Sequence, residues 1–179
     1  MSEIKRYNST MVLLHWLLAI FILGAIFIGA FVLDGMRSDH PQKIILLELH
    51  MIVGIGILLF TILRLIIRYR TVRPTPLKTN NRWLDALASG VHYLLYLLTI
   101  LTALAGFTLA LSAELNVIVF QHIGTLPKDF EDFIAHEIHG IFANLLLYTI
   151  LLHTAAALYH QFILKDGLIS RMSLFKEKS

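Results

Sequence analysis

The last long apolar run, residues 136–164 (HEIHGIFANLLLYTILLHTAAALYHQFIL), sets the strongest limit on what this chain can fold into. It is long enough to cross a bilayer as a helix, for which about 20 apolar residues suffice. Within the run, His139 and His153 lie fourteen residues apart, and His136 and His160 lie near its two ends. Ionisable side chains inside a membrane are unfavourable and usually functional, so these histidines require an explanation.

The fourteen-residue spacing gives both central histidines the same orientation. Fourteen residues are two heptads, so His139 and His153 point the same way from a slightly supercoiled helix, about 21 Å apart along its axis. One imidazole then lies near each face of the membrane. Such a helix suits two cofactors placed one above the other.

The rest of the chain repeats this apolar character. Hydrophobic residues make up 57% of the 179 residues, above the roughly half that is usual in soluble domains. They are gathered into four runs that predict spanning helices, at about 11–33, 44–67, 87–113 and 134–164. The first run is too long for the core of a signal peptide and has no convincing cleavage site. We therefore expect an all-α membrane protein, a four-helix transmembrane bundle that forms a single domain over residues 1–179.

The connections are short. The basic, proline-containing segment at residues 64–82 is expected to be a loop, and the connection at residues 114–133 is expected to include a short surface helix. Neither connection is long enough to hold a soluble module.

Basic residues are distributed unequally between the two predicted sides of the membrane. Only Arg37, Lys43 and Lys128 fall on the side opposite the termini. Twelve fall on the side of the termini: Lys5, Arg6, Arg64, Arg68, Arg70, Arg73, Lys78, Arg82, Lys165, Arg171, Lys176 and Lys178. Because cytoplasmic loops are enriched in Lys and Arg, both termini are predicted to be cytoplasmic. The sequence gives no indication of nucleic-acid binding.

The residue inventory limits the cofactor. The chain has no cysteine and nine histidines. The absence of cysteine excludes disulfides, thiolate-held iron–sulfur clusters and covalent attachment of c-type haem. Histidines are the available ligands, so two b-type haems, each held by two imidazoles, fit this inventory.

Depth in the membrane sorts the histidines into two groups. His50 and His139 both lie near the outer face, so they form the outer pair. Four others lie toward the cytoplasm and leave the inner pair open: His15, His92, His153 and His160. A single membrane histidine can also serve only as a hydrogen-bonding residue between helices.

The residue one turn after each histidine helps to choose the inner pair. A porphyrin covers the helical turn beside its ligand, so a bulky side chain on that face would clash with it. A small residue follows four positions after some histidines: Ala19 after His15, Gly54 after His50, Ala143 after His139 and Ala157 after His153. Larger residues follow His92 and His160. The pattern favours His15 with His153.

The remaining inner-side polar groups have two interpretations each. His92 and His160, with Lys165 and Asp166 at the membrane edge, suit a quinone or proton-transfer site; hydrogen bonding, to haem propionates or elsewhere, explains them equally well. Two arginines suit propionate partners, although anchoring in the inner leaflet explains them at least as well. These are Arg64 and Arg68.

Together these features resemble the bacterial cytochrome b-561 family. The likeness rests on His15 and Trp16 near the start of the first span, His50 in the second, and the run HEIHGIFANLLLYTILLHTAAALYHQFILKD in the fourth. It covers nearly the whole chain. It implies a multi-pass diheme cytochrome of the bacterial inner (plasma) membrane, in contact with membrane lipid. The implied axial ligands are His15 and His153 for the cytoplasmic-side haem, and His50 and His139 for the outer-side haem.

The resemblance also implies a function. The family includes a superoxide:quinone oxidoreductase that oxidises superoxide at the outer face and passes the electrons through two haems to ubiquinone. Applied to this chain, it implies a small-molecule donor near the outer haem and ubiquinone or another quinone near the inner one. Arg37 and Lys43 would guide superoxide. The outer side as a whole carries three basic against eight acidic residues, which opposes attraction of an anion.

Two alternatives remain open. The chain would fit a membrane cytochrome b subunit that passes electrons between a larger dehydrogenase or hydrogenase-like partner and the quinone pool, because similar four-histidine arrangements occur in such subunits. In that case a redox protein, rather than a small molecule, is the donor. A histidine-based metal transporter is a more remote alternative, since the spans hold few carboxylates to share a cation with the histidines.

Overall fold

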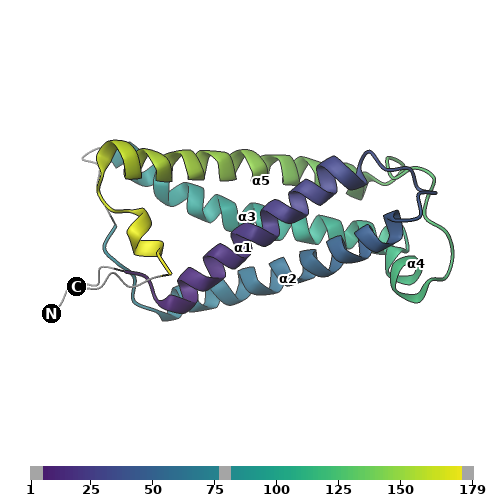
Figure 1. Cartoon of the computed structure of the whole chain (residues 1–179), viewed down its shortest axis with the longest axis horizontal. Helices are drawn as coiled ribbons and strands as arrows, with labels where there is room; N and C mark the ends of the chain where they lie inside the picture. Colours follow the sequence, from purple (N-terminus) through teal and green to yellow (C-terminus); the bar gives the residue numbers. More distant parts are fainter. Residues whose placement is uncertain (1–5, 77–81, 175–179) are drawn as a thin grey trace.

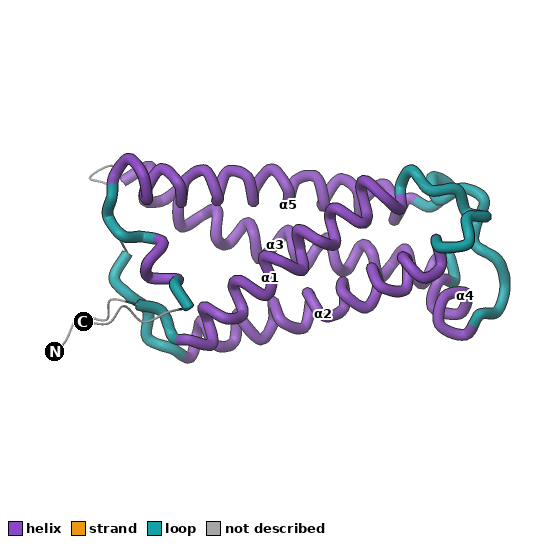
Figure 2. The backbone as a smooth tube through the Cα atoms, viewed as in Figure 1, coloured by secondary structure: helices purple, strands orange, loops and turns teal. Residues whose placement is uncertain are grey.

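The protein is an antiparallel bundle of long helices (Figure 1; Figure 2). The computed structural model describes residues 6–76 and 82–174, and within these ranges it contains helices and loops but no strand. The helices are α1 (Ser9–Phe27), continued by the π-helix Ile28–Leu33; α2 (Lys43–Arg70); α3 (Arg82–Ser112); α4 (Leu115–Gln121); α5 (Ile134–Tyr159), continued by the π-helix His160–Leu164; and the 3₁₀-helix Ile169–Met172.

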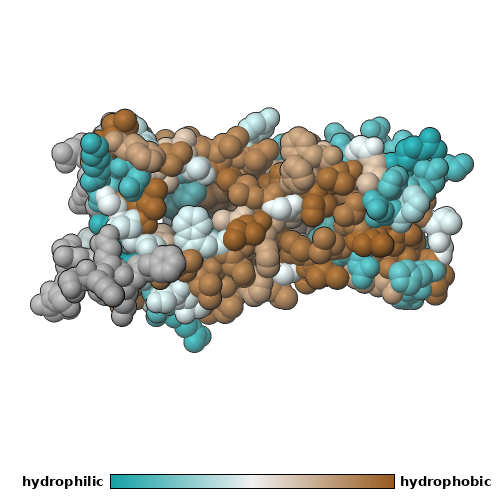
Figure 3. All heavy atoms as spheres, viewed as in Figure 1, coloured by the Kyte–Doolittle hydropathy of each residue, from teal (hydrophilic) through white to brown (hydrophobic). Residues whose placement is uncertain are grey.

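Four of these helical segments are long and apolar enough to cross a membrane. They are Ser9–Leu33, Lys43–Arg70, Asp85–Ser112 and Ile134–Leu164. The mean hydropathy of an 18-residue window in each segment is 2.8, 2.3, 2.2 and 1.8, in that order. On the face in view, apolar side chains form a belt across the middle of the molecule, and polar side chains gather toward both ends (Figure 3). Exposed side chains in the belt, such as Ile20, Phe31 and Leu151, face the lipid in a membrane. The expected all-α transmembrane bundle is confirmed.

The second helix is longer than the sequence predicted. The loop expected from residue 64 begins only at Thr71, because α2 continues through Arg70. The apolar residues at 65–67 support this extension, since they keep the helix favourable while Arg64 and Arg68 lie one turn apart on the same face. The helix ends where the Thr71 amide and hydroxyl both donate to the Ile67 carbonyl, 2.9 and 2.8 Å away, shortly before Pro74.

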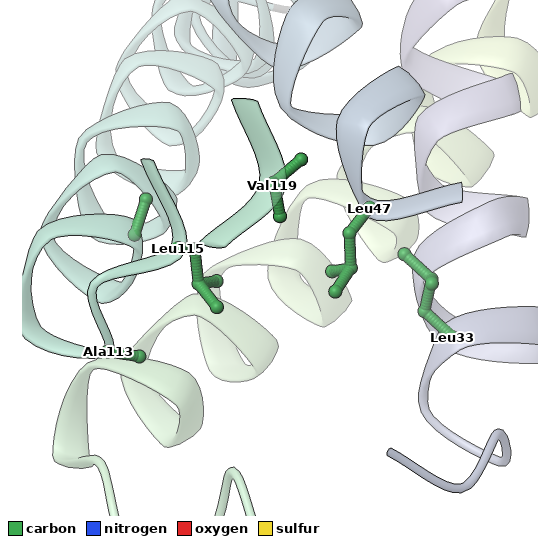
Figure 4. Close-up of a cluster of buried hydrophobic side chains, with 6 residues drawn as sticks. Leu33, Leu47, Ala113, Leu115 and Val119 are labelled. Carbon is green, nitrogen blue, oxygen red and sulfur yellow. The ribbon is translucent and has the colours of Figure 1, made fainter. Parts of the chain in front are cut away.

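Helices α3 and α5 pack side by side, and α1 packs against α2 (Figure 1). The short helix expected in the third connection is α4. It is not a purely surface helix, because two of its own residues, Leu115 and Val119, are buried. With the π-helix that follows α1, with α2 and with the end of α3 it forms a hydrophobic cluster at one end of the bundle (Figure 4), made of Leu33, Leu47, Ala110, Ala113, Leu115 and Val119. The cluster lies at the end of the bundle where α5 begins, and Phe133, the residue before α5, packs against it.

The opposite end gathers the first and last described residues. The Tyr7 amide donates to the Arg171 carbonyl at 3.2 Å, and the Trp16 indole donates to the Met172 carbonyl at 2.8 Å. The Arg171 guanidinium reaches the Thr75 carbonyl at 2.6 Å, in the connection between α2 and α3. The 3₁₀-helix is therefore hydrogen-bonded both to the start of the chain around α1 and to the connection between α2 and α3.

Candidate functional site

The structure brings His50 of α2 and His139 of α5 together inside the bundle. Their ring centroids are 6.1 Å apart and the ring planes are nearly perpendicular, at 79°. Both side chains are half-buried. These are the two histidines that the sequence paired near the outer face.

A second pair lies nearer the other end of α5. His15 of α1 and His153 have ring centroids 6.2 Å apart and an interplanar angle of 73°. His92 of α3 also faces this pair, with its ring 5.2 Å from that of His153. Three imidazoles thus meet at the level that the sequence predicted to be on the cytoplasmic side, where the small-residue pattern favoured His15 with His153.

The spacing within both pairs fits two ligands on one metal ion. A metal–imidazole bond is about 2 Å long and each ring centroid lies about 1 Å behind its nitrogen, so rings on opposite sides of one ion stand about 6 Å apart. The pairs His50 with His139 and His15 with His153 match this separation at 6.1 and 6.2 Å. The 5.2 Å between His92 and His153 is too short by nearly 1 Å. The four residues therefore fit two bis-imidazole haem irons.

Hydrogen bonds occupy one ring nitrogen of most of these histidines. Nδ1 of His139 donates to the Thr102 carbonyl of α3 at 2.9 Å. Nδ1 of His15 lies 3.3 Å from an Arg64 guanidinium nitrogen, and Nδ1 of His92 donates to the Ala88 carbonyl at 2.7 Å. The carbonyl bonds of His139 and His92 keep the ring proton on Nδ1 and leave Nε2 free for a metal, whereas Nδ1 of His15 accepts from the Arg64 guanidinium. A carbonyl partner on the second nitrogen is the usual support of a ligating histidine.

Several buried donors near the inner pair have no hydrogen-bond partner among the described residues. They are the Nε atoms of Arg64 and Arg68 and the hydroxyl of Tyr96. Both guanidiniums lie over the Tyr96 ring, at 5.3 and 5.8 Å from its centroid, and Arg68 also lies 5.4 Å from the Tyr93 ring. Unpaired buried donors are unfavourable unless a ligand satisfies them. Two guanidiniums and a phenol suit the carboxylates of a haem.

The end of α5 carries the polar residues predicted for quinone or proton transfer. His160 and Asp166 are joined by a bond of 2.5 Å between Nδ1 and Oδ2. Left-handed backbone at Lys165 and Gly167, with φ of 52° and 74°, folds the chain back so that the carboxylate reaches the imidazole. Asp166 also accepts from the Leu168 amide at 3.1 Å. Lys165 is exposed beside this pair.

At the other end, the two predicted superoxide guides have partners of their own. Arg37 donates to Asp39 through two hydrogen bonds of 3.1 and 2.9 Å, and both side chains are highly exposed. These bonds hold the pKa of the Asp39 carboxyl below its usual value and raise the pKa of Arg37. Lys43 is buried, donates to the Met36 carbonyl and lies 5.0 Å from the Phe130 ring centroid.

Some residues at the candidate site were not predicted from the sequence. The Thr102 carbonyl accepts a hydrogen bond from His139, and Gly29 lies against the His50 ring. Arg64 and Arg68 both lie over the Tyr96 ring. A backbone carbonyl has no signature in a sequence. Tyr96 did have a signal, because it lies one turn after His92 on the same helix face.

Comparisons with known proteins agree with this architecture. A family model described as "Prokaryotic cytochrome b561" matches residues 6–173. The chain is 30% identical to cytochrome b561 homolog 1 of Escherichia coli over 176 residues, covering 94% of this chain and 97% of the relative. It is 27% identical to cytochrome b562 of Cereibacter sphaeroides, covering 96% and 98%. It is 29% identical to a protein of Yersinia pestis named "Probable superoxide oxidase CybB", covering 94% and 96%.

Proposed function

Because the chain belongs to the prokaryotic cytochrome b561 family of haem-binding membrane electron-transfer proteins, we propose that it is a diheme cytochrome. It carries electrons across the bacterial inner membrane from a donor at the outer face to quinone. The observation that carries the proposal is that the histidines form two imidazole pairs. The ring centroids are 6.1 Å apart in one pair and 6.2 Å apart in the other. Superoxide is the leading donor, supported by the name of the Yersinia pestis relative, and ubiquinone is the leading acceptor.

The proposed roles divide the site by level. His50 and His139 would hold the outer iron, and His15 and His153 would hold the inner iron. His139 would bind through Nε2, because its Nδ1 donates to the Thr102 carbonyl. A bound b-type haem supplies reversible one-electron oxidation and reduction. Two imidazoles on each iron would leave no open coordination position, so the donor and the acceptor would exchange electrons with a haem without binding its iron.

The residues around the inner pair bind charged groups. Arg64, Arg68 and Tyr96 neutralise and hydrogen-bond the haem carboxylates, which would satisfy their unpaired donors. His160 and Asp166 hold and move protons for the quinone. Lys165, at the membrane edge, and His92, beside His153, belong to the same proposed quinone and proton-transfer site.

Orientation follows from the basic residues. The described end where Tyr7 meets Arg171 carries most of them, so we assign this end and both termini to the cytoplasm. Lys5, Lys78, Lys176 and Lys178, which contributed to the predicted bias, lie outside the described residues. We also propose one domain for the whole chain.

The test is a reduced-minus-oxidised visible spectrum of the purified protein with haem quantitation, followed by addition of superoxide and a quinone analogue. We expect two low-spin b-type haems per chain, reduced by superoxide and reoxidised by the quinone. Two haems that superoxide does not reduce would reject this donor. Absence of haem would reject the function as a whole.

A second candidate is the membrane cytochrome subunit of a larger dehydrogenase, which takes electrons from a docked redox protein. It is favoured by the Arg37–Asp39 ion pair, which neutralises positive charge that would attract an anion at the outer face. The acidic outer side suits a basic protein partner. Copurification of a soluble protein in stoichiometric amount would support it.

The charges at Arg37 and Asp39 offer a direct test of superoxide guidance. If Arg37 guides the anion, Arg37→Ala is expected to lower the superoxide-dependent reduction rate severalfold at low salt, and Asp39→Asn is expected to raise it. Both effects should shrink as salt screens the exposed charges. Stopped-flow reduction at two ionic strengths measures this. Rates unchanged in both variants would exclude the guiding role of Arg37. Lys43→Ala tests the second predicted guide in the same assay.

A further inference from the structure

Two glycines lie directly against the rings of the outer histidine pair. A Cβ atom added at Gly106 of α3 would lie 2.9 Å from Cε1 and 3.0 Å from Nδ1 of His139. A Cβ atom added at Gly29 would lie 3.2 Å from Cε1 of His50. Real Cβ atoms do not approach other atoms as closely as 2.9 Å, so any side chain at position 106 would displace the imidazole.

Gly106 also gives His139 access to its hydrogen-bond acceptor. The Thr102 carbonyl that accepts from Nδ1 at 2.9 Å lies one helical turn before Gly106 on the same helix. The imidazole reaches that carbonyl by turning its Nδ1 and Cε1 edge toward this turn, and a Cβ at position 106 would meet that edge. The close approach and the hydrogen bond are therefore one arrangement, and together they fix both the position and the tautomer of the ring.

Gly29 lies where the first spanning helix changes its geometry. The π-helix Ile28–Leu33 follows α1, and the Asp34 amide donates to the Gly29 carbonyl at 3.1 Å, an i+5 bond. Single π-turns are rare and frequently mark functional positions. The His50 ring packs against this glycine, and its buried Nδ1 has no hydrogen-bond partner in the part of the chain that the structure describes. Packing alone therefore sets the orientation of His50 in this structure.

The contact is confined to the outer pair among the described glycines that lie in helices. Several of them would place a Cβ in open space: Gly24, Gly54, Gly56, Gly90 and Gly140. The ring of His15 at the inner level is instead approached by the Arg64 side chain. The outer imidazoles are held by backbone, whereas His15 is held by a movable side chain.

We propose that Gly106 and Gly29 are positioning residues that fix the imidazole planes of the outer haem ligands His139 and His50. Gly106 acts jointly with the Thr102 carbonyl, whose hydrogen bond makes the ligating nitrogen more basic and so favours the oxidised iron. The inference rests on the proposed function, because it requires His50 and His139 to be axial ligands. It predicts that the two haems respond differently to the same alanine substitution.

The test compares Gly106→Ala and Gly29→Ala with Gly90→Ala, a matched control on α3 whose new methyl group would meet nothing. Electron paramagnetic resonance reports the relative orientation of the two imidazoles on each haem, and a redox titration reports each potential. In Gly106→Ala we expect a shifted resonance and a higher potential for the outer haem, or loss of that haem alone. Gly29→Ala should shift the same resonance less, because its contact is longer. The inner haem and the control should keep the wild-type values.

The outer signal is identified as the one lost in His50→Ala. Unchanged outer resonance and potential in both glycine variants would overturn the proposal, as would an equal shift of both haems. If Gly106→Ala does not accumulate in the membrane, Gly29→Ala decides by the same criterion. Fewer than two haems in the wild-type protein would instead overturn the proposed function.

Discussion

Replacing His50 or His139 by alanine is expected to lower the haem content from two per chain to one, and to leave the same remaining haem in both variants. The reason is that each imidazole is half of the axial ligation of one iron, as the 6.1 Å separation of the two rings indicates. His15→Ala and His153→Ala should remove the other haem. Pyridine haemochrome quantitation counts the haems, and resonance spectra show which one remains.

His92→Ala is the control that decides the inner pair. Its ring lies 5.2 Å from that of His153, closer than two ligands of one iron stand, and its Nδ1 donates to the Ala88 carbonyl of its own helix. We expect this variant to keep both haems. If His92→Ala lost the inner haem while His15→Ala kept it, the inner ligands would be His92 and His153 and the assignment would be wrong.

The bundle was predictable because the bilayer imposes a length on each span. A helix must continue until its backbone groups leave the hydrocarbon, so apolar run length alone located four helices. The end of α2 was not predictable in this way. The predicted span ended at residue 67 and the basic segment that overlaps its end indicated a loop, yet α2 continues through Arg70. In the structure Arg64 and Arg68 lie over the Tyr96 ring of α3. That contact depends on α3, which is distant in sequence.

The candidate site shows the same division. The two-heptad spacing predicted that His139 and His153 would face one side of their helix, and the structure brings His50 and His15 to them. Their role as ligands stays a prediction. The Thr102 carbonyl could not be inferred, because any residue has one and only the packing of α3 against α5 selects it. Arg37 was counted as a free charge, although the neighbouring Asp39 binds it.

The second large effect is expected where the chain leaves α5. Asp166 holds His160 by a 2.5 Å bond between carboxylate and Nδ1, and the turn through Gly167 fixes this geometry. Quinone reduction consumes protons, and an imidazole oriented by a carboxylate is suited to transfer them. We expect Asp166→Asn to slow quinone-dependent reoxidation by about 100-fold, at the lower end of the usual contribution of a proton-transferring residue.

The measurement is stopped-flow reoxidation of the reduced protein by a quinone analogue, with haem content and donor-driven reduction as readouts that should not change. Asp132→Asn is a matched control, because Asp132 is exposed just before α5 begins, at the opposite end of that helix from Asp166. His160→Ala should reproduce the loss, and Lys165→Ala shows whether the exposed cation contributes. Wild-type reoxidation in both Asp166→Asn and His160→Ala would place the quinone reaction elsewhere. Loss of haem in Asp166→Asn would show that the pair supports the inner haem rather than the quinone, because a residue that only transfers protons leaves haem binding intact.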